Sequence, residues 1–221
     1  MTELPEEWEV APETGWIEPT LAEEFPGLTI ATSTIESQIG KSSPELRERL
    51  RSLSDSFTGA KAIAMREKPI PWAYRVFYRH IGLDPDTIRT PIEQLVFERI
   101  HDGGFATQGR VGDALTIATV ESGVATSAFN ADIVTGSVGL RLSDEGEGMT
   151  GRTASLPAGT IVIADEQRVI GVLFGDTAED CVVPFRRKGT GRVMVAAIGV
   201  RGVPDIALEE AVWVAMSALR A

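Results

Sequence analysis

The residues that could carry acid–base, nucleophilic or metal chemistry are few in this chain. It has two histidines, His80 and His101, and a single cysteine, Cys181. One thiol excludes an internal disulfide and a Cys-rich zinc site, and two histidines are too few for a multi-histidine metal centre. We expect His80 to pack on the apolar side of a helix and Cys181 to be an inert thiol in a core strand. These residues indicate no metal, no cofactor and no assigned catalytic group.

An acidic cluster is formed by Asp144, Glu145 and Glu147. Carboxylate oxygens are the ligands that hard divalent cations prefer, so this cluster could hold an ion. Gly146 and Gly148 interrupt it, and glycines of this kind favour an exposed turn. We expect the turn.

A basic cluster precedes the glycines at positions 189 and 191. Its side chains could contact phosphate groups, or they could lie on a basic hairpin turn. We keep three residues as the candidate RNA-binding set: Arg186, Arg187 and Lys188.

The composition is that of a globular protein, with 43% hydrophobic and 24% charged residues in 221. The net charge is −11, but the first 30 residues hold eight acidic and no basic side chains, so the remainder carries about −3. Affinity for nucleic acid comes mainly from Lys and Arg contacts to phosphates, so this charge argues mildly against RNA and we expect no DNA binding. No apolar run approaches the ~20 residues that span a bilayer, and the start lacks the features of a signal peptide. We expect a soluble, cytoplasmic protein that does not bind a membrane.

The pattern of caps, apolar spacing and turns predicts one α+β domain over residues 28–221, preceded by an irregular acidic arm at residues 1–27. Its N-terminal helices should pack on mainly antiparallel sheets. Ser43 and the Thr90–Glu93 capping box mark two helix starts. The predicted helices are residues 44–58, 71–81, 91–101, 113–122 and 204–219. The predicted strands are residues 28–35, 138–142, 160–164, 169–174, 181–185 and 193–200, with a hairpin turn at 165–168.

The most specific pattern runs from Gly112 to Asp176. It reads Gly-Asp-Ala-Leu-Thr-Ile-Ala-Thr-Val-Glu-Ser-Gly from Gly112, then Ser-Ala-Phe-Asn from Ser127, Gly-Leu-Arg-Leu from Gly139 and Glu-Gly-Glu from Glu145. Gly-Thr-Ile-Val-Ile-Ala-Asp follows from Gly159, and Val-Leu-Phe-Gly-Asp from Val172. This order and spacing resembles the B3/B4 tRNA-binding and editing domain of the bacterial phenylalanyl-tRNA synthetase β-subunit. It is closer still to free-standing relatives of that domain, and the resemblance covers about residues 70–200.

The resemblance implies a pocket that hydrolyses wrongly aminoacylated tRNA. The family's Thr-Asn pair falls on Leu115 and Thr116, and its histidine falls on Ser127. Ser127 cannot act as a base near neutral pH, so the catalytic residues stay unassigned. The resemblance implies these ligand-positioning residues: Asp113, Thr116, Ser127, Phe129, Asn130 and Gly171.

Two hypotheses follow. The first is a tRNA-binding protein, and a candidate aminoacyl-tRNA deacylase, that acts on misacylated tRNA in trans. The second is a non-catalytic module that binds an amino-acid-like small molecule or a protein partner, because function depends on the site rather than on the fold. A masking role for the acidic arm over basic residues is a third idea, with an ordinary disordered leader as its alternative.

Overall fold

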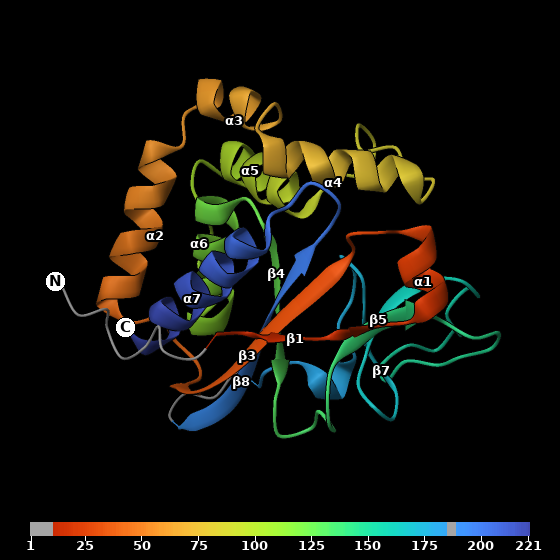
Figure 1. Cartoon of the computed structure of the whole chain (residues 1–221). Helices are drawn as coiled ribbons and strands as arrows, with labels where there is room; N and C mark the ends of the chain where they lie inside the picture. Colours follow the sequence, from red (N-terminus) through yellow and green to blue (C-terminus); the bar gives the residue numbers. More distant parts are fainter. Residues whose placement is uncertain (1–10, 185–188) are drawn as a thin grey trace, which may run out of the picture.

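The computed structural model describes residues 11–184 and 189–221 (Figure 1). Two four-stranded sheets and seven α-helices make up this part of the chain. Helices and strands are mixed along the sequence, and the strand pairs are mostly antiparallel. The predicted α+β fold of a single domain is therefore confirmed.

The first sheet is built on the two longest strands. β3 (Thr29–Gln38) and β8 (Thr190–Gly199) are antiparallel at all ten positions. β4 (Ala125–Asn130) pairs with the other edge of β8, and β1 (Glu13–Thr14) pairs with β3. The strand order is β1-β3-β8-β4. The sheet thus joins segments from the beginning, the middle and the end of the chain.

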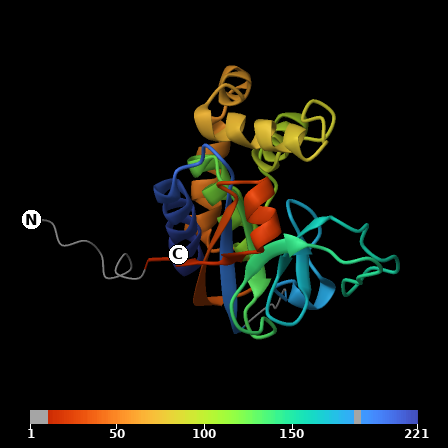
Figure 2. The same cartoon turned by 45° about the vertical axis from the view of Figure 1, so that its right-hand side comes forward.

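The second sheet has the order β2-β5-β6-β7. β2 (Trp16–Ile17) runs parallel to β5 (Gly139–Leu142), and β5, β6 (Ile161–Ala164) and β7 (Val169–Val172) form antiparallel pairs. Asp165 closes the predicted hairpin turn by accepting hydrogen bonds at its Oδ1 from the two N–H groups that follow Glu166. Figure 2 brings this sheet forward and shows the long segment between β5 and β6 extending from it.

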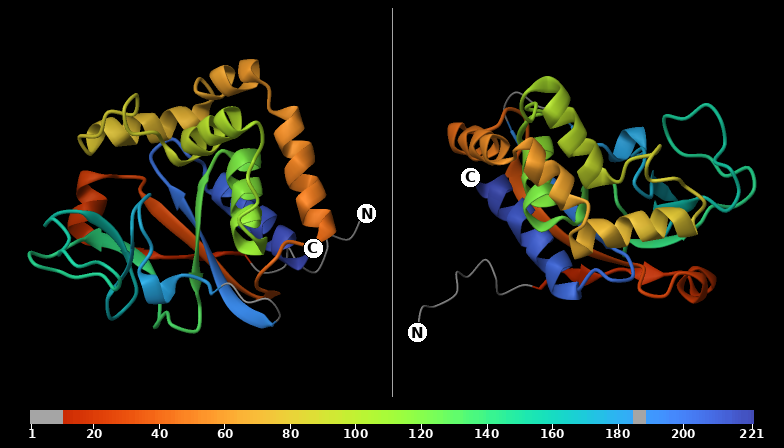
Figure 3. Two further views of the ribbon diagram at one scale, coloured as in Figure 1. Left: turned by 180° about the vertical axis from the view of Figure 1, so that it is seen from behind. Right: turned by 90° about the horizontal axis from the view of Figure 1, so that it is seen from above.

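The helices cover one face of the first sheet and its upper end (Figure 3). This layer comprises α2 (Pro44–Ser56), α3 (Gly59–Met65), α4 (Pro69–His80), α5 (Pro91–Asp102), α6 (Arg110–Ser122) and α7 (Asp205–Arg220), whereas α1 (Pro19–Glu24) lies beside β5 of the second sheet. α6 packs on β4 and on α7, while α7 packs on β3 and β8. α2 and α5 both contact α6. None of the helices in the described residues is long and apolar enough to cross a membrane.

Two predicted helix caps are confirmed. Ser43 Oγ accepts a hydrogen bond from the N–H of Leu46 at 3.1 Å. Thr90 and Glu93 form the reciprocal capping box at the start of α5. In both helices a proline occupies the first turn, where its missing N–H costs nothing.

Two helix boundaries differ from the prediction. The helix expected to reach Gly59 stops at Ser56, and Thr58 caps a separate helix, α3. The helix expected to start at Asp113 begins at Arg110, with Gly109 as its N-cap. Asp113 therefore lies in the first turn of α6 and not at its cap.

α4 buries a different face from the predicted one. The prediction put His80 on the apolar side, but the buried aromatic residues are Tyr74, Phe77 and Tyr78. Trp72 is 49% exposed, and His80 is exposed rather than packed. Apolar spacing misplaced the face because the Tyr74 hydroxyl finds hydrogen-bond partners inside the protein.

Residues 11–27 belong to the domain and do not form an irregular arm. Their strands β1 and β2 join one sheet each, and α1 buries Leu21 completely. The indole of Trp16 packs where Gly139 leaves room, since a Cβ at Gly139 would lie 2.1 Å from the Trp16 ring. The Trp16 Nε1–H donates to the carbonyl of Ser137. Residues 1–10, which hold half of the eight acidic side chains, lie outside the described residues.

Two strand predictions change. The segment from Ala125 to Asn130, which is not among the predicted strands, is strand β4. The strand expected at residues 181–185 is not formed over the described residues 181–184, where Cys181 ends a short 3₁₀ helix (Glu179–Cys181). Cys181 is fully buried all the same, and burial raises the pKa of its thiol to about 11.

Tyr74 ties α4 to the first sheet. Its hydroxyl donates to the carbonyl of Ile198 on β8 and accepts from the N–H of Ala125 on β4, the latter at 3.1 Å. Burial raises the pKa of this hydroxyl, so it remains a donor near neutral pH. One side chain thereby links a helix to two neighbouring strands.

We predict that Tyr74→Phe lowers the free energy of unfolding by about 1–3 kcal/mol, because two buried backbone groups lose a partner. Tyr78→Phe is the matched control: it removes the same atom from a buried tyrosine on the same helix, where the hydroxyl has no hydrogen bond in the described residues. Denaturant unfolding followed by circular dichroism measures both. Equal losses in the two variants would show that the Tyr74 hydroxyl bonds do not stabilise the fold.

Candidate functional site

A pocket of about 310 Å³ lies between α4, α5, α6, β4 and the turn that follows β7. Its size suits a small ligand, since pockets for drug-sized molecules begin at about 300 Å³. Both polar and apolar groups line it. Its walls come from five separate elements, so the fold must form before the pocket exists.

Three threonines form the inner polar wall. Thr116 and Thr119 lie on one side of α6, and Thr126 faces them from β4. The Thr119 and Thr126 hydroxyl oxygens are 2.8 Å apart, and the Thr126 hydroxyl also reaches the carbonyl of Leu115 at 3.3 Å. The Thr116 hydroxyl has no hydrogen-bond partner among the described residues. It is therefore available to a ligand.

Phe174 forms the aromatic wall and sits in an unusual backbone conformation. Its φ of 56° makes it the one non-glycine residue with positive φ in the described part of the chain. A bulky residue rarely adopts this conformation, which costs about 1–3 kcal/mol. The ring is held in place by Tyr74, Phe77 and Tyr78, with centroid distances of 5.7, 6.1 and 5.7 Å. Aromatic packing thus offsets the backbone strain and presents the ring to the pocket.

Two opposite charges line the pocket without pairing. Arg89 comes from the loop before α5, and Glu98 comes from α5 itself. Neither forms an ion pair within the described residues; the Glu98 carboxylate accepts one hydrogen bond from the Gln94 amide at 2.6 Å. The Arg89 guanidinium carbon lies 3.7 Å from the centre of the exposed Phe97 ring, in a cation–π contact. The pocket is therefore lined by an arginine and a glutamate that do not pair with each other, and the arginine carries its guanidinium on the Phe97 ring beside the pocket.

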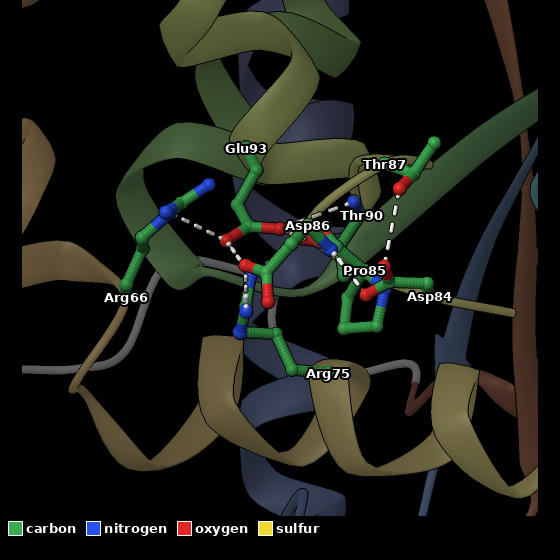
Figure 4. Close-up of polar contacts among 8 residues, drawn as sticks. All are labelled: Arg66, Arg75, Asp84, Pro85, Asp86, Thr87, Thr90 and Glu93. Carbon is green, nitrogen blue, oxygen red and sulfur yellow. Dashed lines mark hydrogen bonds and ion pairs between the residues drawn. The ribbon is translucent and has the colours of Figure 1, made fainter.

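A buried carboxylate, that of Glu93, holds the loop that carries Arg89 (Figure 4). One oxygen accepts from Arg75 at 2.7 Å and from Arg66 at 2.9 Å. The other accepts from the Thr90 N–H at 3.2 Å and from the Thr90 hydroxyl at 3.0 Å. Arg75 reaches onward to Asp86, whose pKa it lowers through this hydrogen bond. The ion pairs join α3, α4, α5 and the loop between the last two.

Tyr78 shows the electrostatic consequence of this network at the pocket wall. Burial, together with the negative charge of Glu93, raises the pKa of the Tyr78 hydroxyl. The hydroxyl stays protonated near neutral pH and offers no base for hydrolysis.

Asp113 does not face the pocket as a free group. Its carboxylate is fully buried and accepts three hydrogen bonds, from the Ser42 hydroxyl at 2.5 Å, the Thr107 hydroxyl at 2.6 Å and the Gln108 N–H at 2.7 Å. These bonds attach the start of α6 to the loops on either side. Asp113 positions the helix that bears Thr116.

The other residues carried over from the resemblance do not gather at the threonines. Thr126 faces α6, so Ser127 and Phe129, at odd positions of the same strand, face the opposite side of the sheet. There Phe129 meets Gly171 of β7, where an added Cβ would lie 3.4 Å from the ring. Asn130 closes a turn by accepting from the N–H of Asp132 at 3.3 Å. Only Thr116 of the predicted set lines the pocket.

The remaining candidates are placed as follows. Glu147 of the acidic cluster forms a two-bond ion pair with Arg141, which lowers the pKa of its carboxyl group. In the described residues, no three His, Cys, Asp or Glu side chains are grouped to hold a metal ion. The predicted RNA-binding residues lie outside the described residues: Arg186, Arg187 and Lys188.

Sequence reasoning missed Arg89, Glu98, Thr119 and Thr126. Thr119 lies three positions after Thr116 on a helix, so helical spacing could have identified it. The other three reach the pocket through the tertiary fold, which no local spacing reveals.

No family model matches the chain, and a search of the curated proteins finds no match. The resemblance to the synthetase editing domain stays a prediction.

We predict that Asp113→Ala lowers the free energy of unfolding by about 3 kcal/mol, because one buried and two part-buried donors lose the acceptor that they share. Asp205→Ala is the matched control, since Asp205 is also in the first turn of a helix but is exposed. It should cost about 0.3–1 kcal/mol. Thermal and urea unfolding measure both. A well-folded Asp113→Ala protein with unchanged stability would mean that this carboxylate is free for a functional role.

Proposed function

We propose that the chain binds a small molecule of the amino-acid type in the threonine-lined pocket. The observation that carries the proposal is the pair of unpaired opposite charges, Arg89 and Glu98, in one small pocket. An amino acid is a zwitterion, so its carboxylate matches the guanidinium and its ammonium group matches the glutamate. The rings of Phe174 and Tyr78 and the side chain of Leu115 would receive an apolar side chain.

Binding is favoured over catalysis because the residues carried over from the resemblance supply no base to the pocket. The position that corresponds to the family's histidine, Ser127, faces the other side of the sheet from Thr116. Tyr78 stays protonated, and the buried Asp113 is saturated with donors. A group that activates water near the free Thr116 hydroxyl is therefore not among the residues carried over from the resemblance.

We expect apolar L-amino acids to raise the melting temperature of the protein at millimolar concentration, because a ligand that binds only the folded state stabilises it. Arg89→Ala should weaken the affinity by about 10- to 100-fold, the loss expected for a hydrogen-bonded charge pair of about 1.5–3 kcal/mol. Differential scanning fluorimetry over the common amino acids, followed by calorimetry on the best, provides the measurement.

Arg79→Ala is the matched control for this experiment. Arg79 is an exposed arginine on α4 whose guanidinium lies 5.8 Å from the ring centre of Trp72, so it makes the same kind of contact away from the pocket. It should leave the affinity unchanged. No thermal shift with any amino acid would contradict the proposal.

A second candidate is hydrolysis of misacylated tRNA in trans, as the resemblance to the editing domain implies. One observation favours it: Leu115 and Thr116, on which the family's Thr-Asn pair falls, both line this pocket. A hydroxyl that only positions the ester would suffice if a tRNA hydroxyl assists the attack.

Deacylation of a pool of correctly and wrongly charged tRNAs tests this candidate. Under it, we expect loss of the amino acid from one species well above the spontaneous rate, and expect Thr116→Ala to abolish that loss. Thr150→Ala, on an exposed threonine far from α6 in sequence, is the control that should retain activity. Spontaneous rates for every species would leave amino-acid binding as the remaining function.

A further inference from the structure

We propose that Arg89 is an anchor for a free carboxylate group, and that Arg75, Asp86 and Glu93 are positioning residues that hold it at the pocket. The inference rests on the proposed function and names the ligand class of that site: a free amino acid and not an aminoacyl ester. It depends on three observations about the loop before α5.

The first observation is that the loop is attached on both sides of Arg89. Arg75 binds the side chain of Asp86 at 2.5 Å and the carbonyl of Pro85 at 3.4 Å. Glu93 binds Thr90, the residue directly after Arg89, through both its N–H and its hydroxyl. Figure 4 shows these side chains converging from α4, α5 and the loop. The backbone of Arg89 is therefore fixed between two attachment points.

The second observation is that the segment between these points is itself a closed turn. The Asp84 carboxylate accepts from the Asp86 N–H at 3.0 Å and from the Thr87 hydroxyl at 3.1 Å. The carbonyl of Asp84 accepts from the N–H groups of Thr87 and Ile88 at 3.0 and 2.8 Å. These bonds close the turn on itself and restrain the backbone that leads to Arg89.

The third observation is the state of the Arg89 side chain. The Phe97 ring holds the guanidinium from one side, at 3.7 Å, while its N–H donors have no acceptor among the described residues. A planar guanidinium with free, pre-oriented donors is suited to a carboxylate, which it can bind through two parallel hydrogen bonds. An ester presents no such group, because one of its oxygens is alkylated and neither carries a full charge.

The charges of the network support the same conclusion. Arg66 and Arg75 are matched by Asp86 and Glu93, so the network is neutral as a whole. It fixes the loop without cancelling the positive charge of Arg89. The buried pair of Arg75 and Glu93 cannot be broken without large cost, whereas Asp86, with a side chain 60% exposed, can be changed in a folded protein.

The test compares three probes by calorimetry: L-phenylalanine, its methyl ester and 2-phenylethylamine. The wild-type protein should bind L-phenylalanine at least tenfold more tightly than the ester or the amine. Asp86→Asn should weaken the affinity for L-phenylalanine about three- to tenfold. It should leave the affinities for the ester and the amine unchanged. Asp55→Asn is the control, since Asp55 is exposed on α2 and should change none of the affinities.

A double-mutant cycle separates positioning from general damage to the fold. In an Arg89→Ala background, Asp86→Asn should cause no further loss of affinity for L-phenylalanine, because the guanidinium that Asp86 helps to position is gone. An equal further loss in that background overturns the positioning role. A thermal melt of each variant identifies any that is unfolded.

The positioning role of Asp86 can also be tested in the ligand-free protein by NMR. The Arg89 side-chain protons should show an upfield ring-current shift from Phe97 in the NMR spectrum, and Asp86→Asn should reduce that shift. An undiminished shift overturns the positioning role. Equal binding of L-phenylalanine and its ester by the wild-type protein overturns the carboxylate anchor while the proposed function stands, and binding of none of the amino acids overturns both.

Discussion

The pairing of β3 with β8 is the constraint on which the rest of the structure depends. The two strands, one near the start of the domain and one near its end, pair at ten consecutive positions. The entire segment between them is therefore a long loop that this pairing closes. Closing such a long loop is entropically unfavourable, and the pairing must be supported by burial on both sides of the sheet. Helices α6 and α7 supply this burial on one face. On the other face Phe129 meets the second sheet at Gly171.

The same constraint explains why the pocket forms at the upper end of the helix layer. β4 is an edge strand of the first sheet, and α6 packs directly on it, which brings Thr116 and Thr119 opposite Thr126. α4 is fixed across the end of the sheet by the Tyr74 hydroxyl. α5 is then fixed to α4 by the ion pairs around Glu93. Specific polar contacts thus place α4, α5, α6 and β4, whereas the Phe174 wall is placed by aromatic packing.

Local sequence signals predicted the elements better than the site. Ser43, the Thr90–Glu93 capping box and the turn at residue 165 carry their information within a few positions, and the structure has all three. β4 escaped prediction because its sequence, Ala-Thr-Ser-Ala-Phe-Asn, has no clear alternation of apolar and polar residues. Arg75 and Glu93 look like ordinary surface charges in the sequence, since burial of an ion pair is decided by the packing of two helices. The pocket residues Arg89 and Glu98 depend on that packing, so the sequence could not show that they share a site.

The burial of Cys181 has a practical consequence. It is the single cysteine of the chain, and it is both inaccessible and protonated at neutral pH, which are the two conditions that suppress reaction with thiol-directed reagents. A cysteine introduced on the surface, for example in the loop between α4 and α5, would then be the one reactive thiol in the native protein. A spin label or fluorophore could be attached there selectively without first removing the natural cysteine. The natural cysteine is thus no obstacle to attaching a probe selectively to the loop between α4 and α5.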